Sequence, residues 1–358
     1  MKKLKRILIS ITLSLIILGS FLIFSAKGMD LFISHLWKVA AALIGLIFFS
    51  MFPYKQYQNW SKPLMILAIA LLLSTVFFAP SVKGAARWID LKFIRFQPSE
   101  LAKLLLLIHL AVLIQKKGKD IENYKKGLVY PLFWIFITAF LILIQPNVST
   151  SLIVLFTSFT LLFVGGAKFK HLSGIVATAV IIGGMAIMIF PHSRHRVITY
   201  ADSFVNGTSI NMQVLQSKIA LGSGGFLGLG IGESRQSDLF LPEPHNDFIF
   251  SVLGEELGFI GAFLVLSAYL AIFLVGLIIA KRTKDEFGQL LAFGISFMIV
   301  TSAFLHAAVG IGILPTTGIT LPFVSFGGTS IIVFCISTGI LINIATQGQK
   351  KKVKVNGK

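Results

Sequence analysis

Long apolar stretches separated by short polar segments dominate this chain of 358 residues. Each stretch is close to the length that an α-helix needs to cross the hydrocarbon core of a bilayer, about 20 residues. The pattern therefore predicts an all-α polytopic membrane protein with a single membrane domain, 1–358. Ten spans are expected, at about 7–26, 34–52, 61–79, 98–115, 128–144, 148–166, 171–190, 247–280, 287–310 and 323–346.

An even number of spans places both termini on one side of the membrane. Most of the 32 Lys and Arg residues lie in the short connections and tails of that side. Because short cytoplasmic segments are enriched in Lys and Arg, both termini are predicted to be cytoplasmic. The basic start before Ile7, followed by Ser25-Ala26, also resembles a secretory signal peptide. Its apolar run is longer than a typical signal core and further spans follow, which favours a retained first span.

Two connections on the opposite side are longer than the rest: 80–97 and, longest of all, 191–246. A long connection within a compact membrane protein is usually functional or disordered. The second one is rich in glycine near its end, but it lacks the low-complexity composition of a flexible tether. We therefore expect 191–246 to form an ordered cap outside the cytoplasm.

Composition narrows the function further. With 55% hydrophobic and 13% charged residues, the chain is not a soluble globular protein, and its net charge of +18 is spread over the connections rather than gathered as for nucleic acid. Its one cysteine, Cys335, excludes an intrachain disulfide and a cysteine-based zinc site. No P-loop, dinucleotide fingerprint, H-E-x-x-H or G-x-S-x-G is present, and the His residues lack zinc-like spacing.

The stretch LPEPHNDFIF joins the long polar segment to a long apolar helix. Pro242 and Pro244 cannot continue a helix, so the helix is expected to begin after Pro244. Asn246 or Asp247 is then its natural N-cap. Asp247 is a candidate catalytic carboxylate, and a purely capping role is the alternative.

The helix that follows is too long for the bilayer. From Phe248 to Ala280 it would measure roughly 50 Å, against a hydrocarbon core of about 30 Å. Because Lys281 and Arg282 mark the cytoplasmic end, the excess should project or bend on the outer side. Glu255 and Glu256 would then lie near the outer interface, solvated or bridged to the loop, and Glu256 would be half a turn out of phase with Asp247.

Charged residues at membrane depth are functional candidates by default. In QPSELAK, Pro98 suits the first position of a helix, Glu100 falls in its first turn, and Lys103 shares its face. A self-neutralising pair is one interpretation. The other adds cations from the preceding connection to make a site for an anionic head group such as a lipid pyrophosphate. These cations are Arg87, Lys92 and Arg95.

The long outer loop carries further charged candidates. Each by itself is more typical of a solvated side chain, but all face the same compartment as Arg87 and Asp247. They are Arg194, Arg196, Lys218, Arg235, Glu243 and His245.

Four motifs together resemble the SEDS family (shape, elongation, division and sporulation), over the whole chain. They are AARWIDLKFIRFQPSELAK at 85–103, QSKIALGSGGFLGLGIG at 216–232, LPEPHNDFIFSVLGEELGFIGA at 241–262 and LPTTGITLPFVSFGGTS at 314–330. The family's ten spans and large loop between spans seven and eight are similar to the arrangement expected here.

The resemblance implies a peptidoglycan glycosyltransferase that polymerises lipid II at the outer face of the cytoplasmic membrane. It implies that Asp247 is the essential carboxylate and that Glu100 and Lys103 matter for activity. Substrate-binding roles are also expected for Arg87, Arg196, Lys218 and His245. Expected partners are a class B penicillin-binding protein, which is a transpeptidase, and other division proteins. No cofactor is implied with certainty; a divalent ion, Mg²⁺ or Mn²⁺, would suit the leaving pyrophosphate.

Within the family, the motifs look more like the division (FtsW) branch than the elongation (RodA) branch. The chain departs from the common pattern in QPNVST, where Asn147 stands in place of the usual Asp and Ser149 in place of the usual Gly, and at His306, where Asn is common. A lipid II flippase and a scaffold that only recruits the transpeptidase are the alternative functions. Most predicted spans lack an ionisable residue in their middle, which disfavours a transporter.

Overall fold

The computed structural model describes residues 1–78, 87–90, 95–189, 194, 197–202, 212–234 and 245–355. The elements are α1 (Lys2–Met51), α2 (Gln56–Phe78), β1 (Ile89–Asp90), β2 (Arg95–Phe96), α3 (Pro98–Lys117), η1 (Gly118–Glu122), η2 (Tyr124–Leu128), α4 (Val129–Ile144), α5 (Val148–Val164), α6 (Phe169–Ile189), α8 (Met212–Ser223), α10 (Ile249–Arg282), α11 (Glu286–Gly310) and α12 (Gly328–Val355).

Helices coincide with all ten predicted spans, so the prediction of an all-α polytopic membrane protein is confirmed. The first two spans form one element, α1, which breaks at Gly28 with a φ of 73°. In the described part of the chain, eight helical segments are long and apolar enough to cross a membrane, and α5 is a shorter apolar helix. The antiparallel strands β1 and β2, in which Ile89 pairs with Phe96, are a small addition that the sequence did not predict.

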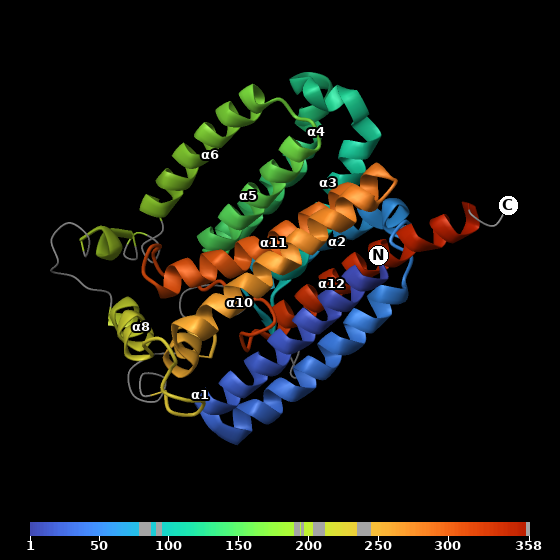
Figure 1. Cartoon of the computed structure of the whole chain (residues 1–358). Coiled ribbons are helices and arrows are strands. Elements are labelled where there is room, and N and C mark those ends of the chain that lie inside the picture. Colours follow the sequence, from blue (N-terminus) through green and yellow to red (C-terminus); the bar gives the residue numbers. More distant parts are fainter. Residues whose placement is uncertain are drawn as a thin grey trace.

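The most buried helices are α3, α12 and α11, which form the centre of the bundle (Figure 1). α3 is apolar on nearly all its faces, as expected of a helix surrounded by protein. The other long helices bury a smaller share of their surface and expose many large apolar side chains, which suits contact with lipid. α6 packs on α5 and stands apart from the centre of the bundle (Figure 1).

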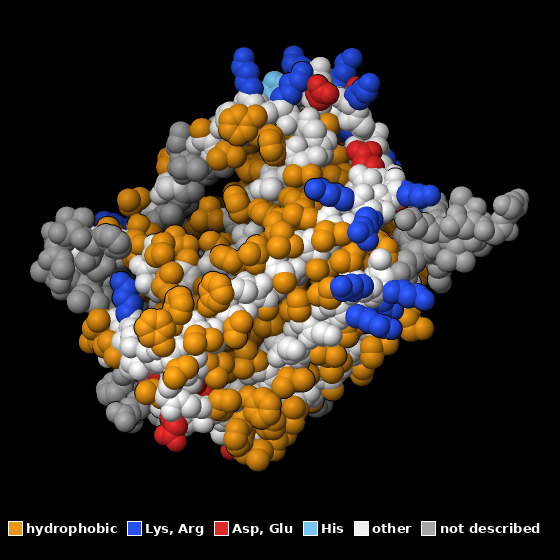
Figure 2. Space-filling model, viewed as in Figure 1, with side chains coloured by type: hydrophobic (Ala, Val, Ile, Leu, Met, Phe, Trp, Pro, Cys, Tyr) orange, Lys and Arg blue, Asp and Glu red, His pale blue; other side chains and the backbone are white. Residues whose placement is uncertain are grey.

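Both termini lie at one end of the bundle, which we call the terminal face; the opposite end is the far face (Figure 1). Lys and Arg side chains gather at the edge of the molecule on the terminal face (Figure 2). The Tyr54 hydroxyl donates a hydrogen bond to Asp285, and Asn343 joins the Tyr54 backbone to Ser50. Burial and the neighbouring Asp285 raise the pKa of Tyr54, so the phenol stays protonated as a donor.

The long helix α10 is broken at Gly258, whose φ is 67°. The break turns backbone groups toward the glycine-rich segment that follows α8. Leu229 N donates to Glu255 O at 3.0 Å, and Phe259 N donates to Gly225 O at 2.9 Å. The expected bend is therefore a specific docking site for residues 225–230. The backbone of this segment is hydrogen-bonded to α10, although its side chains are mostly exposed.

Replacing Gly258 by Ala should destabilise this docking. A Cβ atom there would lie 2.4 Å from Gly228 N, and an L-residue with this φ adds about 1–2 kcal/mol of strain. We expect a lower midpoint of thermal unfolding and faster proteolysis within 212–234. Gly174→Ala is the control, because a Cβ atom at Gly174 meets nothing within 4 Å. Equal behaviour of the two variants would show that the break does not hold the cap.

Two helix starts differ from the prediction. α10 begins at Ile249 rather than 247, and α12 begins at Gly328 rather than 323. Pro322 and the positive φ of Phe323, 67°, keep the chain out of a helix before Gly328. Residues 311–327, the α11–α12 loop, therefore fold back over the far face, where Leu321 to Ser325 are buried.

Candidate functional site

Asp247 lies in a turn on the far face, directly before α10. The N-cap of α10 is Phe248, and no side chain caps it, so the predicted N-cap role of Asn246 or Asp247 is wrong. The turn is held instead by the α11–α12 loop: Phe326 N donates to His245 O at 3.1 Å, and the Ser325 hydroxyl donates to Asn246 O at 3.0 Å. Tertiary contacts thus position the Asp247 backbone without using its carboxylate as a cap.

The Asp247 carboxylate is partly exposed and faces the α11–α12 loop. A Cβ atom at Gly318 would lie 3.8 Å from Asp247 Oδ2, and Gly318 has a φ of 72°. A residue without a side chain therefore borders the carboxylate.

The ring of Phe326 contacts two further side chains, those of Lys38 and His245. The Lys38 ammonium lies 3.5 Å from the centre of the Phe326 ring, and His245 packs on the same ring edge to face, with centroids 5.4 Å apart. The sequence analysis did not single out Lys38. Its signal was present, since it is an ionisable residue within the second apolar run.

Glu100 and Lys103 form the ion pair that their spacing predicts. Lys103 Nζ lies 2.9 Å from Glu100 Oε1. Both residues are buried: Glu100 is 6% exposed and Lys103 is 5% exposed. The start of α3 is tied to α12, because Gln97 N donates to the Thr329 hydroxyl at 3.0 Å. Segment 325–329 thus contacts both the Asp247 turn and the start of the helix that carries the ion pair.

The cationic cluster predicted from Arg87, Lys92 and Arg95 stays a prediction, and the structure describes partners for two of its members. Arg87 donates to the backbone carbonyls of Gln145 and Pro146, in the turn between α4 and α5. The Arg95 side chain is 71% exposed and lies 4.0 Å from Asp90. Lys92 lies outside the described residues. Arg87 therefore holds the α4–α5 turn, and Arg95 is a separate surface cation.

A cavity of about 380 Å³ lies beside Arg87, between α5, α11 and the α11–α12 loop. Its wall is mostly apolar, with polar groups at the α4–α5 turn and in the loop. The apolar lining includes Leu152, Ile153, Phe156, Leu305 and Leu314, and the polar lining includes Arg87, Asn147, Ser149, Thr316 and Thr317. Such a space suits an apolar chain attached to a polar head group.

Two of the departures from the family pattern, Asn147 and His306, have structural roles. The Asn147 side chain caps α5, accepting a hydrogen bond from Thr150 N at 3.3 Å. His306 is buried, and its Nδ1 lies 2.7 Å from Ile319 O in the α11–α12 loop. Both side chains therefore support the polypeptide around the cavity.

Of the candidates in the long loop, Lys218 is exposed on α8. Its side chain lies over Gly312, where a Cβ atom would come 2.2 Å from Lys218 Cε. The neighbouring Ser217 bonds to Gly310 O at 2.6 Å and docks α8 on the end of α11. Arg194 is also exposed. Arg196, Arg235 and Glu243 lie outside the described residues.

Glu255 and Glu256 are buried at 1% exposure each, so the expectation of interfacial solvation is wrong, whereas its alternative, a salt bridge to the loop, stays a prediction. Glu255 accepts hydrogen bonds from the Ser234 hydroxyl at 2.5 Å and the Ser223 hydroxyl at 3.4 Å, and Glu256 accepts one from Ser25. The break at Gly258 folds the first turns of α10 beneath the cap. Both carboxylates therefore hold the cap and α1 in place.

Metal binding finds little support among the side chains whose positions are described. They include no group of three His, Cys, Asp or Glu residues that could hold an ion.

The fold and the far-face turn together define a polytopic membrane protein with a carboxylate, Asp247, held at one end of an apolar bundle. The family model described as a cell cycle protein, for FtsW, RodA and SpoVE, matches residues 2–350. The chain belongs to this family.

Relatives from several branches are similar over most of their length. The probable peptidoglycan glycosyltransferase FtsW of Geobacter sp. (strain M18) is 36% identical over 317 residues, covering 86% of this chain and 85% of that protein. Stage V sporulation protein E of Bacillus subtilis (strain 168) is 33% identical over 355 residues, covering 95% and 96%. The peptidoglycan glycosyltransferase MrdB of Escherichia coli (strain K12) is 34% identical over 343 residues, covering 94% and 92%.

Two solved structures share the fold. A chain of a peptidoglycan synthase complex that coordinates polymerization and crosslinking superposes with a TM-score of 0.80 at 24% identity, covering 95% of this chain and 97% of that one. The rod shape determining protein RodA of Thermus thermophilus superposes with a TM-score of 0.70 at 24% identity, covering 95% and 96%.

Proposed function

We propose that this membrane protein is a peptidoglycan glycosyltransferase that polymerises lipid II, with Asp247 as the general base. The observation that carries the proposal is the Asp247 turn. It presents a partly exposed carboxylate beside Gly318, and two hydrogen bonds from the α11–α12 loop hold its backbone. The names of the FtsW and MrdB relatives, both peptidoglycan glycosyltransferases, support the same reaction.

In this proposal Asp247 removes the proton from the acceptor sugar hydroxyl as the hydroxyl oxygen attacks the anomeric carbon of the donor. The bond from that carbon to the pyrophosphate oxygen breaks, the configuration inverts, and undecaprenyl pyrophosphate leaves. Positioned general bases typically contribute about 10²- to 10⁴-fold to rate. The leaving group carries negative charge, which nearby cations stabilise.

Substrate-binding roles are proposed for residues around this turn. Lys218 and Arg87 lie on the far face, and Arg196 belongs to the same loop as Lys218. The buried pair Glu100 and Lys103 would sense or orient the pyrophosphate, and His245 would line the acceptor side. The apolar cavity beside Arg87 has the composition to hold part of a prenyl chain.

Orientation follows from the same proposal. Lys and Arg gather at the terminal face, which we place in the cytoplasm, so that Asp247 faces the outer leaflet (Figure 2). A fluorescent protein fused after Lys358 should then fold and fluoresce in cells. If alkaline phosphatase fused at the same position were exported and active, the C-terminus would lie outside the cytoplasm and the proposed orientation would be wrong.

Lipid II polymerisation by the purified chain tests the function. We expect glycan strands to form in detergent or vesicles when a cognate class B penicillin-binding protein is present; the related fold in a peptidoglycan synthase complex supports such a partner. The assay is run with and without the partner, and with Mg²⁺, Mn²⁺ or a chelator. Absence of polymer under all of these conditions would count against the enzyme.

A flippase and a scaffold are the competing functions. Lipid II translocation in vesicles that persists in Asp247→Ala, without polymerisation by the wild-type chain, would favour transport. A scaffold predicts that Asp247→Asn still supports cell-wall synthesis as long as it binds its partner. Most predicted spans lack an ionisable residue in their middle, which favours the polymerase over a transporter.

A septal role during cell division is the finer proposal, resting on the FtsW-like motifs. Relatives of the division, sporulation and elongation branches have similar identities to this chain. Depletion in the native host separates them. Filamentous cells indicate the septal role, whereas rounded cells indicate a RodA-type role in elongation and cell shape.

A further inference from the structure

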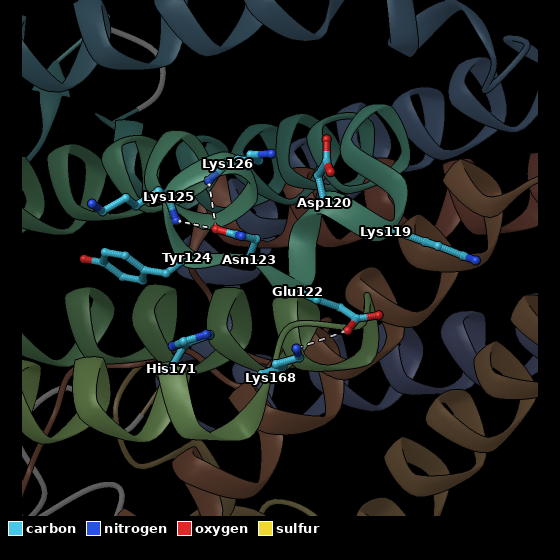
Figure 3. A pocket seen from close by; sticks show the side chains of 9 residues that line it. All are labelled: Lys119, Asp120, Glu122, Asn123, Tyr124, Lys125, Lys126, Lys168 and His171. Carbon is cyan, nitrogen blue, oxygen red and sulfur yellow. Dashed lines mark hydrogen bonds and ion pairs between the residues drawn. The ribbon is translucent and has the colours of Figure 1, made fainter.

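A second hollow has a volume of about 450 Å³ (Figure 3). It lies on the terminal face, at the opposite end of the bundle from the start of α10 (Figure 1). One wall is the connection from α3 to α4, and the other is the turn from α5 to α6. Its lining consists of Lys119, Asp120, Glu122, Asn123, Tyr124, Lys125, Lys126, Lys168 and His171. No residue of this hollow takes part in the proposed transfer reaction.

The hollow is positively charged. Its lysines outnumber its carboxylates by two, and one carboxylate is already engaged, since Glu122 lies 3.5 Å from Lys168. Among the described carboxylates, none forms an ion pair with Lys119, Lys125 or Lys126. A phosphate group, which accepts several charge-assisted hydrogen bonds, matches this arrangement.

The lysines stand on a firmly held backbone. The Asn123 side chain accepts hydrogen bonds from Lys125 N at 3.1 Å and Lys126 N at 3.4 Å. Gly127 allows a close crossing, because a Cβ atom there would lie 2.0 Å from Asp120 O. A site held in this way loses little conformational entropy when it binds an anion.

The surroundings favour a lipid over a soluble anion. The hollow lies where α3 and α5 end and where α4 and α6 begin, and the ends of apolar spans are expected near the lipid head groups. Directly beside it, large apolar side chains are exposed: Phe163 at 53%, Val164 at 49% and Phe169 at 71%. A phospholipid whose phosphate lies in the hollow can therefore place its acyl chains against these apolar side chains. A soluble phosphate has no acyl chains and makes no use of these side chains.

We propose that this hollow binds the phosphate head group of an anionic phospholipid and thereby braces the first turn of α6 against the α3–α4 connection. α6 has few other supports in the described part of the chain: it packs on α5, while Tyr124 and His171 meet across the hollow with ring centroids 5.9 Å apart (Figures 1 and 3). Binding here is independent of the chemistry proposed for Asp247.

Photolabelling of the full-length chain in vesicles tests the site. A photoreactive phosphatidylglycerol should label peptides that contain 118–126 and 164–171, and a photoreactive phosphatidylcholine should label them much less. The double variant Lys125→Gln/Lys126→Gln should reduce phosphatidylglycerol labelling of these peptides roughly 10-fold or more. The backbone bonds of Asn123 survive in this variant, so the loop retains its conformation.

The matched control is Lys281→Gln/Arg282→Gln, which removes the same charge from exposed residues at the end of α10, also on the terminal face. It should label like wild type. If both variants lost phosphatidylglycerol labelling equally, the labelling would reflect general surface charge and not a specific site. If neither variant lost labelling, the proposed site would be wrong. If inorganic phosphate or an acidic peptide at millimolar concentration abolished labelling of the wild-type hollow, the site would be one for a soluble ligand, and the lipid proposal would be wrong.

Discussion

Replacing Asp247 by Ala will lower the rate of lipid II polymerisation at least about 100-fold, because the acceptor hydroxyl loses its base. Asp247→Asn should be nearly as inactive, since it keeps the size of the side chain but cannot take a proton. Neither change should unfold the protein, because the Asp247 side chain does not cap α10 and the turn is held through the backbone of His245 and Asn246. The measurement is polymer formation by the purified protein with its partner.

The control for this experiment is Asp30→Asn, which removes an exposed carboxylate near the break in α1. It should polymerise lipid II at the wild-type rate. Thermal unfolding and partner binding should be unchanged in all three variants. If Asp247→Ala polymerised lipid II at the wild-type rate, Asp247 would not be the general base.

Breaking the buried pair of Glu100 and Lys103 will have the largest effect on stability. Glu100→Gln leaves the Lys103 ammonium in the interior without its partner at 2.9 Å. Loss of one partner of a buried ion pair typically costs about 3–5 kcal/mol, whereas replacing both partners by uncharged side chains is often neutral. We therefore expect a strongly lowered unfolding midpoint in Glu100→Gln and recovery in the double variant Glu100→Gln/Lys103→Met.

Activity then separates structure from function at this pair. If Lys103 and Glu100 orient the pyrophosphate, the double variant will be stable but poorly active. A double variant with both stability and polymerisation restored would reduce the pair to a structural element. Glu122→Gln is the control for stability, because its ion pair with Lys168 is more than half exposed and contributes at most about 1 kcal/mol.

Features that depend on residues close in sequence were easier to predict than features that depend on contacts between distant segments. Glu100 and Lys103 could be paired from the sequence, because three residues along a helix bring two side chains to one face. The N-cap assignment of Asp247 used equally local reasoning and was wrong. Two bonds from Ser325 and Phe326, distant in sequence, hold this turn in a conformation that local preferences do not specify.

Glu255 and Glu256 show the same limit. A straight helix places them at the interface, but Gly258 adopts a left-handed conformation and the freed backbone groups bond to residues 225–230. This compensation is visible only when both segments are in place. Lys38 was overlooked for a related reason, since its ring partner Phe326 lies far along the chain.

The sequence by itself determined the class of protein, the ten helices, the ion pair in α3 and the position of Asp247 at the start of a long helix. These features depend on hydrophobic run length, proline and glycine placement, and spacing within one helix, all of which are local. The tertiary structure decided how α10 breaks, which carboxylates are buried beneath the cap, and how the α11–α12 loop holds the Asp247 turn. Those outcomes depend on hydrogen bonds and close packing between distant segments, whose free energy is gained only after the bundle has formed.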